Sequence, residues 1–493
     1  MSVDPWRPRW HYSAARNWLN DPNGLVFFEG EYHLFYQYNP FGDQWGHMSW
    51  GHAVSADLLH WQELPVAIAE TERVSIYSGS VVVDAHNTSG FGDGRNAPLV
   101  AAYTGCLRRP EGGQAQELAY SHDRGRTWTP YAANPVLDLG LREFRDPKVF
   151  WHAPTTRWIM AVVLSELRAV VFYASHDLKA WTELSRFADD LAGQGIWECP
   201  DLLELPVEDE AASAWVLKVD VFEGHPSQGS GARLFVGHFD GTCFVAEPST
   251  APNWADHGAD FYAALSWNGL QDRAVWIGWM NCHRYAKQLP TSPWRGAMSV
   301  PRELTLRRGS DGGLRLRQQP VRELATLRRA CHEQAQLEVP EGEVACLPAG
   351  FESRSLDIEL ILDPGDCDEC GLLLRAGVAG GTRVGVDWRR GTVFVDRARA
   401  HADAGGFAPE DSHYATRREA PFAAVVAGRP LRLRVLLDLC SVEVFADDGE
   451  LVITEQIFPA PGALATRLFA HGGPARVREL RVHELAGCIS AVR

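Results

Sequence analysis

The sequence lacks any long apolar run and any excess of positive charge. Even the apolar stretch at residues 169–174 is far shorter than the roughly 18 to 20 residues that a helix needs to span a bilayer. Lys and Arg number 47 against 63 Asp and Glu, so the formal net charge is -16 at pH 7. Nucleic-acid binding requires a basic face that neutralises phosphates. We therefore expect neither a membrane nor a nucleic-acid partner.

Signals for export and for a disulfide framework are also missing. The first eight residues lack the basic segment followed by an apolar one that marks a secretory leader. The ten cysteines are irregularly spaced, and Cys367 and Cys370 form only a weak Cys-x-x-Cys motif, so we expect mostly reduced thiols. Together these observations predict a cytoplasmic location, with secretion as the alternative, since a secreted chain without its leader would have the same sequence.

No familiar cofactor or nucleophile motif occurs. The glycines around Gly380 are followed by no Lys-Ser/Thr pair, which argues against a phosphate-binding loop, and there is no Gly-x-Ser-x-Gly elbow. His47 and His52 match no recognised metal-ligand spacing, and ordinary hydrogen-bonded histidines explain them better. We predict neither a metal nor another cofactor.

What the sequence does contain is three acidic residues placed before prolines, each at the start of an apolar, strand-like run. Asp21 and Asp146 directly precede a proline, and Glu198 lies two residues before one. Asp-Pro by itself is a common turn dipeptide. Three such acids in similar settings nevertheless suggest one shared site.

A repeat runs through the same region, which consists of short runs rich in Val, Ile, Phe, Tyr and Trp. Its copies read Ser-x-Asp, a short turn and then Trp, with a looser fourth copy. The Asp residues are Asp57, Asp123, Asp177 and Asp240, which are 66, 54 and 63 residues apart. We interpret each copy as a turn whose Asp side chain bonds the following backbone, between two strands. One period holds about four strands, the size of a β-propeller blade.

The three acids occupy similar positions within this repeat. With Ser78 and Asp260 they form the series 21, 78, 146, 198 and 260, which we interpret as five blade starts. The first strand of each blade lines the propeller axis, so these side chains should converge on one funnel. The expected fold class is therefore all-β, beginning with a five-bladed β-propeller.

A second region follows the propeller, as a chain of 493 residues leads us to expect. Residues 321–327 have a helical period that suits a linker. Beyond them, residues 355–362 and 431–436 alternate between apolar and polar, and residues 441–445 lead to an Asp-Asp-Gly turn. Such alternation is typical of antiparallel strands with one wet face, so we predict a β-sandwich. The expected boundaries are 1–320 for the propeller, 321–335 for the linker and 336–493 for the sandwich.

Carboxyl groups that converge in a funnel lined by Trp and Tyr are suited to hydrolysing a sugar acetal. One carboxylate attacks or stabilises the anomeric carbon, while a second, protonated, donates its proton to the leaving oxygen. Asp21 is flanked by amide donors such as Asn20 and should stay ionised. Glu198 follows apolar residues and faces two anions, so we expect its pKa to be raised and Glu198 to be the acid. Arg145 favours the charged form of Asp146.

These stretches resemble the signatures of family 32 glycoside hydrolases, the invertases, inulinases and levanases. The matching stretches are Asn20-Asp21-Pro22-Asn23-Gly24, Arg145-Asp146-Pro147, Glu198-Cys199-Pro200, Tyr77-Ser78-Gly79-Ser80 and Ser441-Val442-Glu443-Val444-Phe445. The resemblance implies a five-bladed propeller plus a β-sandwich. It also implies an exo-acting β-fructosidase that retains configuration and releases terminal fructose from sucrose or fructans such as inulin and levan. Asp21 would be the nucleophile, Asp146 the transition-state stabiliser and Glu198 the acid/base.

The same matching implies a pocket for the terminal fructose. The residues that would line it are Asn20, Gln37, Trp45, Tyr77, Ser78, Arg145 and Trp279. Tyr77 stands where relatives usually carry Phe, which adds a hydroxyl to the pocket wall. Residues 281–285 read Asn-Cys-His-Arg-Tyr where an Asn-Asn-Trp-Gln-Tyr run is more usual, which removes an aromatic ring from the rim. The choice among sucrose, inulin and levan therefore stays open.

Two other functions fit the same residues. A fructosyltransferase would use the same covalent intermediate but pass it to a sugar instead of water. A carbohydrate-binding propeller without catalysis would be expected to lack at least one acid, and all three are present. The sandwich strands show no cluster of aromatic residues, which favours a scaffold that braces the propeller.

Overall fold

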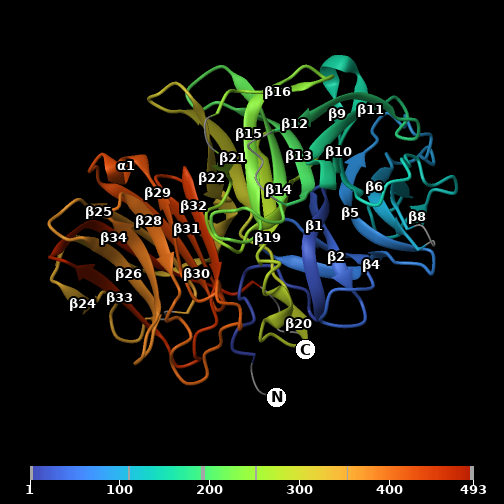
Figure 1. The fold of residues 1–493 in the computed structure, drawn as a ribbon. Coiled ribbons are helices and arrows are strands. Elements are labelled where there is room, and N and C mark those ends of the chain that lie inside the picture. Colours follow the sequence, from blue (N-terminus) through green and yellow to red (C-terminus); the bar gives the residue numbers. More distant parts are fainter. Residues whose placement is uncertain (1–3, 109–111, 190–194, 250–251, 352–353, 489–493) are drawn as a thin grey trace.

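The computed structural model describes residues 4–108, 112–189, 195–249, 252–351 and 354–488. Figure 1 shows a propeller-like body formed by the strands up to β22 and a sandwich formed by those from β23 onward. The all-β expectation is confirmed, since the helices of the described residues are short: α1 (Ala423–Val426), η1 (Ala153–Thr155), η2 (Ser165–Leu167), η3 (Ala286–Gln288) and η4 (Arg322–Leu327). Within those ranges no helix is long and apolar enough to cross a membrane. All ten cysteines, each inside a described range, are free thiols, as their spacing predicted.

The described strands of the propeller-like body form five antiparallel sheets, apart from one short parallel pairing. The first contains β1 (Asn17–Phe28), β2 (Glu31–Asn39), β3 (Ser49–Ser55), β4 (Trp61–Ile68) and β20 (Trp294–Arg295). The second contains β5 (Val74–Val83), β6 (Leu99–Leu107), β7 (Gln114–Ser121) and β8 (Thr129–Pro130). The third contains β9 (Phe144–His152), β10 (Arg157–Leu164), β11 (Ala169–Ser175) and β12 (Thr182–Ala188). The fourth contains β13 (Trp197–Pro206), β14 (Ser213–Val221), β15 (Gly231–Phe239), β16 (Phe244–Ala246) and β17 (Asn253–Trp254). The fifth contains β18 (Tyr262–Ser266), β19 (Ala274–Trp279), β21 (Arg302–Arg308) and β22 (Leu314–Pro320).

One strand of each sheet takes part in a closed ring. β1 contacts β5, β5 contacts β9, β9 contacts β13, β13 contacts β18, and β18 contacts β1. Apolar side chains pack between neighbouring sheets; Phe35 and Trp50 of the first sheet, for example, share a core with Val81 and Tyr103 of the second. The late strand β20 pairs in parallel with β1, so the end of this body is joined to its beginning. Residues far apart in sequence are thereby brought to one axis.

The Asp turns predicted from the repeat are confirmed. All four connect the third and fourth strands of a sheet, and the Asp57 carboxylate accepts the backbone N–H groups of Leu59 and His60 at 3.0 and 2.8 Å. The Trp61 indole closes the same turn by donating to the Leu58 carbonyl at 3.0 Å. The corresponding bonds recur around Asp177. The repeat thus marks the outer corner of each of the first four sheets.

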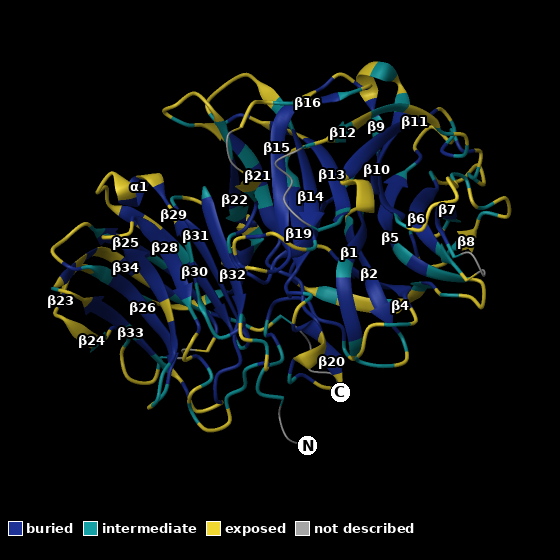
Figure 2. Cartoon of the chain, in the orientation of Figure 1, coloured by how far each residue is buried: buried dark blue, intermediate teal, exposed yellow. Residues whose placement is uncertain are grey.

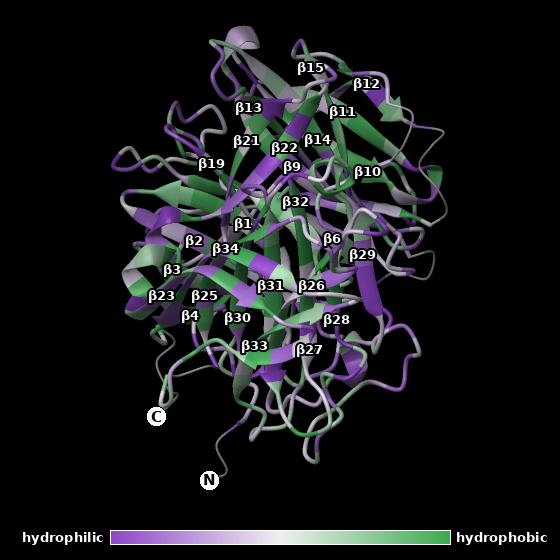
Figure 3. Ribbon diagram, turned by 90° about the vertical axis from the view of Figure 1, so that its left-hand side faces the viewer, coloured by the Kyte–Doolittle hydropathy of each residue, from purple (hydrophilic) through white to green (hydrophobic). Residues whose placement is uncertain are grey.

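Two six-stranded sheets make up the sandwich. One contains β23 (Arg328–Val339), β34 (Ala475–Leu485), β25 (Leu356–Asp363), β30 (Leu431–Asp438), β31 (Ser441–Ala446) and β32 (Leu451–Gln456). The other contains β24 (Gly342–Ala345), β33 (Ala465–His471), β26 (Glu369–Ala376), β27 (Thr382–Asp387), β28 (Thr392–Asp396) and β29 (Arg417–Pro421). Their facing side chains form one core, with Leu360, Leu433 and Val444 on one side and Leu372 and Val384 on the other. Hydrophobic and hydrophilic segments alternate along these strands, and the exposed residues gather at loops and edges (Figures 2 and 3).

The predicted alternation and hairpin of this region are confirmed. Strands β31 and β32 are joined by a turn in which Asp447, Asp448 and Gly449 all have positive φ, at 42°, 60° and 84°. Residues 321–335, expected as a linker, divide between η4 and the first part of β23, which pairs with β34.

Buried ion pairs join the two bodies. Arg302 of β21 bonds Glu443 of β31 at 2.7 Å and Asp256 at 3.0 Å, and all three side chains are buried. Asp260 bonds the buried Arg397 at 2.7 Å. Asp260, which we expected at a blade start near the funnel, therefore serves the interface between the bodies.

Candidate active site

Each strand that carries a predicted acid is irregular where that acid stands. The pairing of β1 with β2 slips between Leu19 and Pro22, and that of β13 with β14 slips between Glu198 and Asp201. β9 slips against β10 next to Asp146, whose φ is 66°. A β-bulge redirects side chains, and proteins use it beside active sites. The proline after each acid fits this pattern, because proline cannot donate to the ladder and occurs at bulges.

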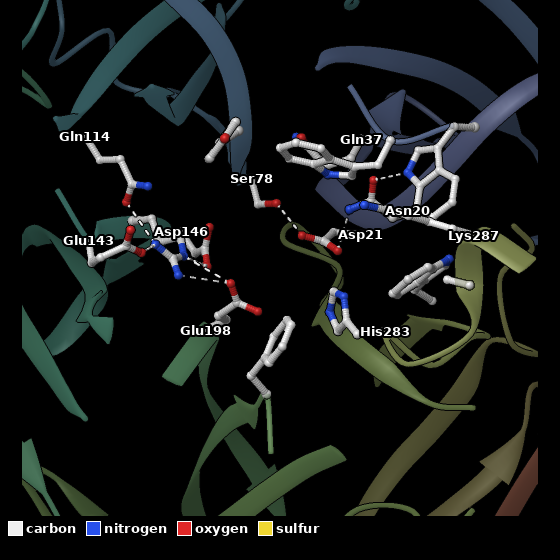
Figure 4. A pocket seen from close by; sticks show the side chains of 17 residues that line it. Asn20, Asp21, Gln37, Ser78, Gln114, Glu143, Asp146, Glu198, His283 and Lys287 are labelled. Carbon is white, nitrogen blue, oxygen red and sulfur yellow. Dashed lines mark hydrogen bonds and ion pairs between the residues drawn. The ribbon is translucent and has the colours of Figure 1, made fainter. Parts of the chain in front are cut away.

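A cavity of about 370 Å³ opens where these irregular strands meet (Figure 4). Its lining includes all ten residues singled out from the sequence: Asn20, Asp21, Gln37, Trp45, Tyr77, Ser78, Arg145, Asp146, Glu198 and Trp279. Trp45 lies at the rim, where it is 47% exposed, whereas Trp279 and Gln37 are buried. The tertiary structure thus gathers residues from all five sheets around one space.

Asp21, on strand β1, is held by two short hydrogen bonds. The Asn20 amide donates to Asp21 Oδ1 at 2.8 Å, and the Ser78 hydroxyl donates to Oδ2 at 2.6 Å. Asn20 is itself fixed by the indole N–H of Trp18, at 2.7 Å from Asn20 Oδ1. Both donors orient the carboxylate and stabilise its negative charge.

Asp146 lies beside Asp21, with Cys199 between them. Cys199 Sγ is 3.7 Å from Asp21 Oδ2 and 3.6 Å from Asp146 Oδ2, and the Cys199 backbone N–H donates to Asp146 Oδ2 at 2.9 Å. The Cys199 φ of 45° places that residue in the left-handed region. Its strained backbone therefore directs an N–H group at a buried carboxylate.

Arg145 links the third acid, Glu198, to Asp146. Its Nε and Nη2 each lie 3.1 Å from Glu198 Oε1, whereas Nε is 3.9 Å from Asp146 Oδ2. Gln114 and Glu143 hold the other side of the guanidinium through Nη1. On the far side of Glu198, the Tyr262 hydroxyl donates to Oε2 at 2.6 Å. Glu198 thus bonds the Arg145 guanidinium through one oxygen and the Tyr262 hydroxyl through the other.

The charges in this cluster differ from the expectation for two of the acids. Burial, reinforced by the negative charges of Glu198 and Asp21, raises the pKa of Asp146 to about 7, although Arg145 opposes it. Burial also acts to raise the pKa of Glu198, but Arg145 and the Tyr262 hydroxyl hold that pKa below its usual value. The prediction of a raised pKa at Glu198 is therefore wrong for the free protein, whereas Arg145 does favour the charged form of Asp146, as predicted, but is outweighed by burial. Arg145 adjoins Asp146 in sequence, yet its guanidinium reaches across the cavity to Glu198.

Several residues of the site had no signal strong enough to find them in the sequence. They are Trp18, Gln114, Glu143, Phe222, Ala286 and Lys287, whereas His283, which also lines the cavity, belongs to the run at residues 281–285 that the sequence placed at the rim. Glu143 stands two positions before Arg145 on one strand-like run, a spacing that places both side chains on one face. Gln114 and Phe222 follow no motif. Tyr262 is two residues beyond Asp260 and begins β18, so the predicted series marked a position next to this strand but named the wrong side chain.

The chemistry available here is that of carboxylates acting on a neutral, hydroxyl-rich substrate. Among the described residues, no group of three or more His, Cys, Asp and Glu side chains is arranged to hold a metal ion. A nucleophilic carboxylate opposite a second carboxyl group that can hold a proton is the arrangement that cleaves glycosidic bonds. The propeller-like domain and its acidic cavity are those of a glycoside hydrolase.

Comparison with known proteins gives the family. Residues 11–320 match the family described as "Glycosyl hydrolases family 32 N-terminal domain", and residues 323–484 match "Glycosyl hydrolases family 32 C terminal". The chain belongs to glycosyl hydrolase family 32, as the sequence motifs predicted.

Individual relatives are similar over nearly the whole chain. A levanase of Bacillus subtilis is 44% identical over 98% of this chain and 71% of its own length, and an extracellular exo-inulinase of Aspergillus awamori is 37% identical over 98% and 95%. The crystal structure of the A. awamori exo-inulinase superposes with a TM-score of 0.93 at 36% identity, covering 99% of this chain and all of that one. A β-fructofuranosidase of Schwanniomyces occidentalis complexed with fructosyl-erythritol superposes with a TM-score of 0.89 at 29% identity, covering 99% of each chain.

These relatives contradict the expected cytoplasmic location. Exo-inulinases of Aspergillus awamori and Aspergillus ficuum, both 37% identical over 98% of this chain, are named extracellular. Sorting machinery recognises a targeting segment and not the folded domain. Composition and cysteine spacing were therefore poor guides to the compartment.

Proposed function

We propose that this protein is a retaining exo-β-fructosidase that releases terminal β-D-fructofuranosyl residues from sucrose or fructans. The observation that carries the proposal is the convergence of Asp21, Asp146 and Glu198 from three ring strands on one cavity that also holds Arg145. The names of the relatives, levanase, exo-inulinase and invertase, support the substrate class.

The proposed reaction has two displacements. Asp21 attacks the anomeric carbon of the terminal fructose, and the bond from that carbon to the leaving oxygen breaks as Glu198 transfers its proton to that oxygen. Water then attacks the fructosyl ester, giving its proton back to Glu198 and regenerating Asp21. Asp146 and Arg145 bind fructose hydroxyls and stabilise the transition state.

The location of the proton follows from the coupling between the acids. As the pH falls, Asp146 and Glu198 take up one shared proton, since two ionised carboxylates beside Asp21 repel one another. Sugar hydroxyls that bond Arg145 and Asp146 weaken the hold of the guanidinium on Glu198. The proton then resides on Glu198, next to the leaving oxygen.

We also propose the number of blades, the domain boundaries and the residues that bind the terminal fructose. The five sheets around the ring are five propeller blades, the catalytic domain occupies residues 1–320, the linker lies within 321–335 before β23 begins at Arg328, and the sandwich extends from β23 to residue 493. The cavity takes the end of a chain, and the roles of Asn20, Gln37, Trp45, Tyr77, Ser78 and Trp279 are to bind the terminal fructose. Their support is that they line one small cavity together with the acids.

The test is to incubate the protein with sucrose, inulin and levan and to resolve the products over time. We expect free fructose from the start of the reaction, with the anomeric configuration at first release retained in NMR spectra. Longer oligomers formed at high sucrose would identify a fructosyltransferase instead. Inverted product or binding without cleavage would overturn the proposal.

A further inference from the structure

A second hollow adjoins the acidic cavity. It has a volume of about 420 Å³ and is lined by Phe222, Glu223, Gly224, Gln228, Gly229, His283 and Arg284. Phe222 and His283 also line the acidic cavity, so these two side chains stand at the junction of the two spaces. A substrate whose terminal sugar fills the first space can extend past this junction into the second.

His283 is held rigidly at the junction by aromatic rings. Its ring centroid lies 4.5 Å from that of Phe222, 4.7 Å from that of Tyr262 and 5.2 Å from that of Trp279. Figure 4 shows the imidazole on the cavity wall next to Asp21 and Glu198. A side chain packed in this way pays little conformational entropy when it binds a ligand.

The His283 ring nitrogen Nε2 is shielded from solvent and has no hydrogen-bond partner among the described residues. Burial lowers the pKa of His283, against the opposing charges of Glu198 and Asp21, so the imidazole is neutral near pH 7. A neutral imidazole offers one donor and one acceptor, which matches a sugar hydroxyl. An unpaired polar atom in such a place gains most from a ligand that supplies the missing bond.

Arg284, in the wall of the second hollow, is fixed by the sandwich. Arg284 Nε lies 3.2 Å from Asp411 Oδ2, and its Nη2 lies 2.7 Å from His413 Nδ1. Both partners are in the segment between β28 and β29. Arg284 Nη1 also bonds the Gln228 carbonyl at 3.2 Å, which ties the sandwich to the wall of the hollow.

We infer that His283 is a specificity-determining residue that hydrogen-bonds a hydroxyl of the leaving sugar, and that the second hollow receives that sugar and the units that follow it. The inference rests on the proposed function and assigns the leaving-group side of the same site. The sandwich contributes to substrate choice by fixing Arg284 through Asp411. Its role then extends beyond bracing the propeller.

The test compares substrates with different leaving groups. Methyl β-D-fructofuranoside releases methanol, which has no further hydroxyl, whereas sucrose releases glucose and 1-kestose releases a disaccharide. His283→Phe keeps the aromatic packing but removes both nitrogens, and His283→Gln keeps a polar end group. We expect His283→Phe to lower the ratio of kcat/KM for sucrose to that for methyl fructoside by about tenfold, the effect of one buried hydrogen bond. His283→Gln should recover most of that ratio.

A second pair of variants examines the contribution of the sandwich. Asp411→Ala should raise KM for 1-kestose more than KM for sucrose, because Arg284 loses its fixed position. Asp363→Ala is the matched control, since Asp363 bonds Arg478 at 2.6 Å, with side chains 16% and 45% exposed against 14% and 38% for Asp411 and Arg284. Asp363 lines neither cavity.

The outcomes separate the two proposals. If the unmodified protein cleaves none of the three substrates, the proposed function fails and the inference falls with it. If it cleaves them all but His283→Phe leaves the ratio unchanged, or lowers all three rates equally, the inference alone is overturned.

Discussion

Tyr262 offers a direct test of how the site tunes its acid. Its hydroxyl donates to Glu198 Oε2 at 2.6 Å in a buried setting, and a bond of this kind to a charged group contributes about 2 kcal/mol. It stabilises the ionised form of Glu198, so Tyr262→Phe should favour the protonated form. A protonated Glu198 can still bond the phenol, so the difference between the two forms is smaller than the full 2 kcal/mol. Because one pKa unit corresponds to about 1.4 kcal/mol, we expect the pKa of Glu198 to rise by about 1 unit.

The assay is kcat/KM for sucrose as a function of pH. Glu198 must be protonated to act as the acid, so raising its pKa moves the alkaline limb of the profile to higher pH by about 1 unit. Tyr12→Phe is the matched control, because the Tyr12 hydroxyl is equally buried but donates to Tyr36, at 2.9 Å, and not to a carboxylate. An alkaline limb that stays in place or moves to lower pH in Tyr262→Phe would refute the reasoning.

Four further predictions concern the acids, pH, the domain interface and metals. Asp21→Ala and Glu198→Ala should each lower turnover on sucrose by several orders of magnitude while thermal unfolding is unchanged, and full activity in either would remove the mechanism. Because burial raises the pKa of Asp146 to about 7 and the acid pair must hold one proton, kcat/KM of the unmodified protein should fall as the pH rises above about 7; a flat profile up to pH 9 would contradict this. Arg302→Met removes the guanidinium that pairs with the buried carboxylates of Glu443 and Asp256, although Glu443 keeps its bonds to His11 and to the Val300 N–H, so denaturant titration should show about 3 kcal/mol less free energy of unfolding, and a change below 1 kcal/mol would show that the pairs are dispensable. A chelator such as EDTA should leave the rate of fructose release unchanged, and a loss restored by added metal would refute that prediction.

Local chemistry explains how much of the fold could be predicted from the sequence. The Asp turns and the alternating strands of the sandwich depend on side chains within a few residues of one another, such as Asp57 and Trp61, and the structure has them where expected. The gathering of the three acids was predictable because a repeat places residues of equal phase at one axis. Asp260 was misassigned because sequence spacing locates a strand start only to within a few residues, and alternate residues of a strand face opposite sides.

The electrostatics of the site were not predictable from neighbours in the chain. Arg145 adjoins Asp146, yet the guanidinium extends away from its own backbone and bonds Glu198, which is 53 positions further along. A long side chain is oriented by whichever partners the fold brings within reach, and Coulomb energy depends on distance in space. Phe222 was missed for the same reason, and the run at residues 281–285 gave no sign that His283 meets Phe222, since the two side chains come together only when the strands β14 and β19 are in place.

The sequence by itself determined the family, the strand content and the identity of the three acids, because these are encoded in short motifs and in a periodic pattern of turns. Only the tertiary structure decided which acid carries a raised pKa, which tyrosine bonds Glu198, and which side chains separate the two hollows. Burial and distance between groups govern those properties, and both exist only once sheets distant in sequence have packed around a common axis.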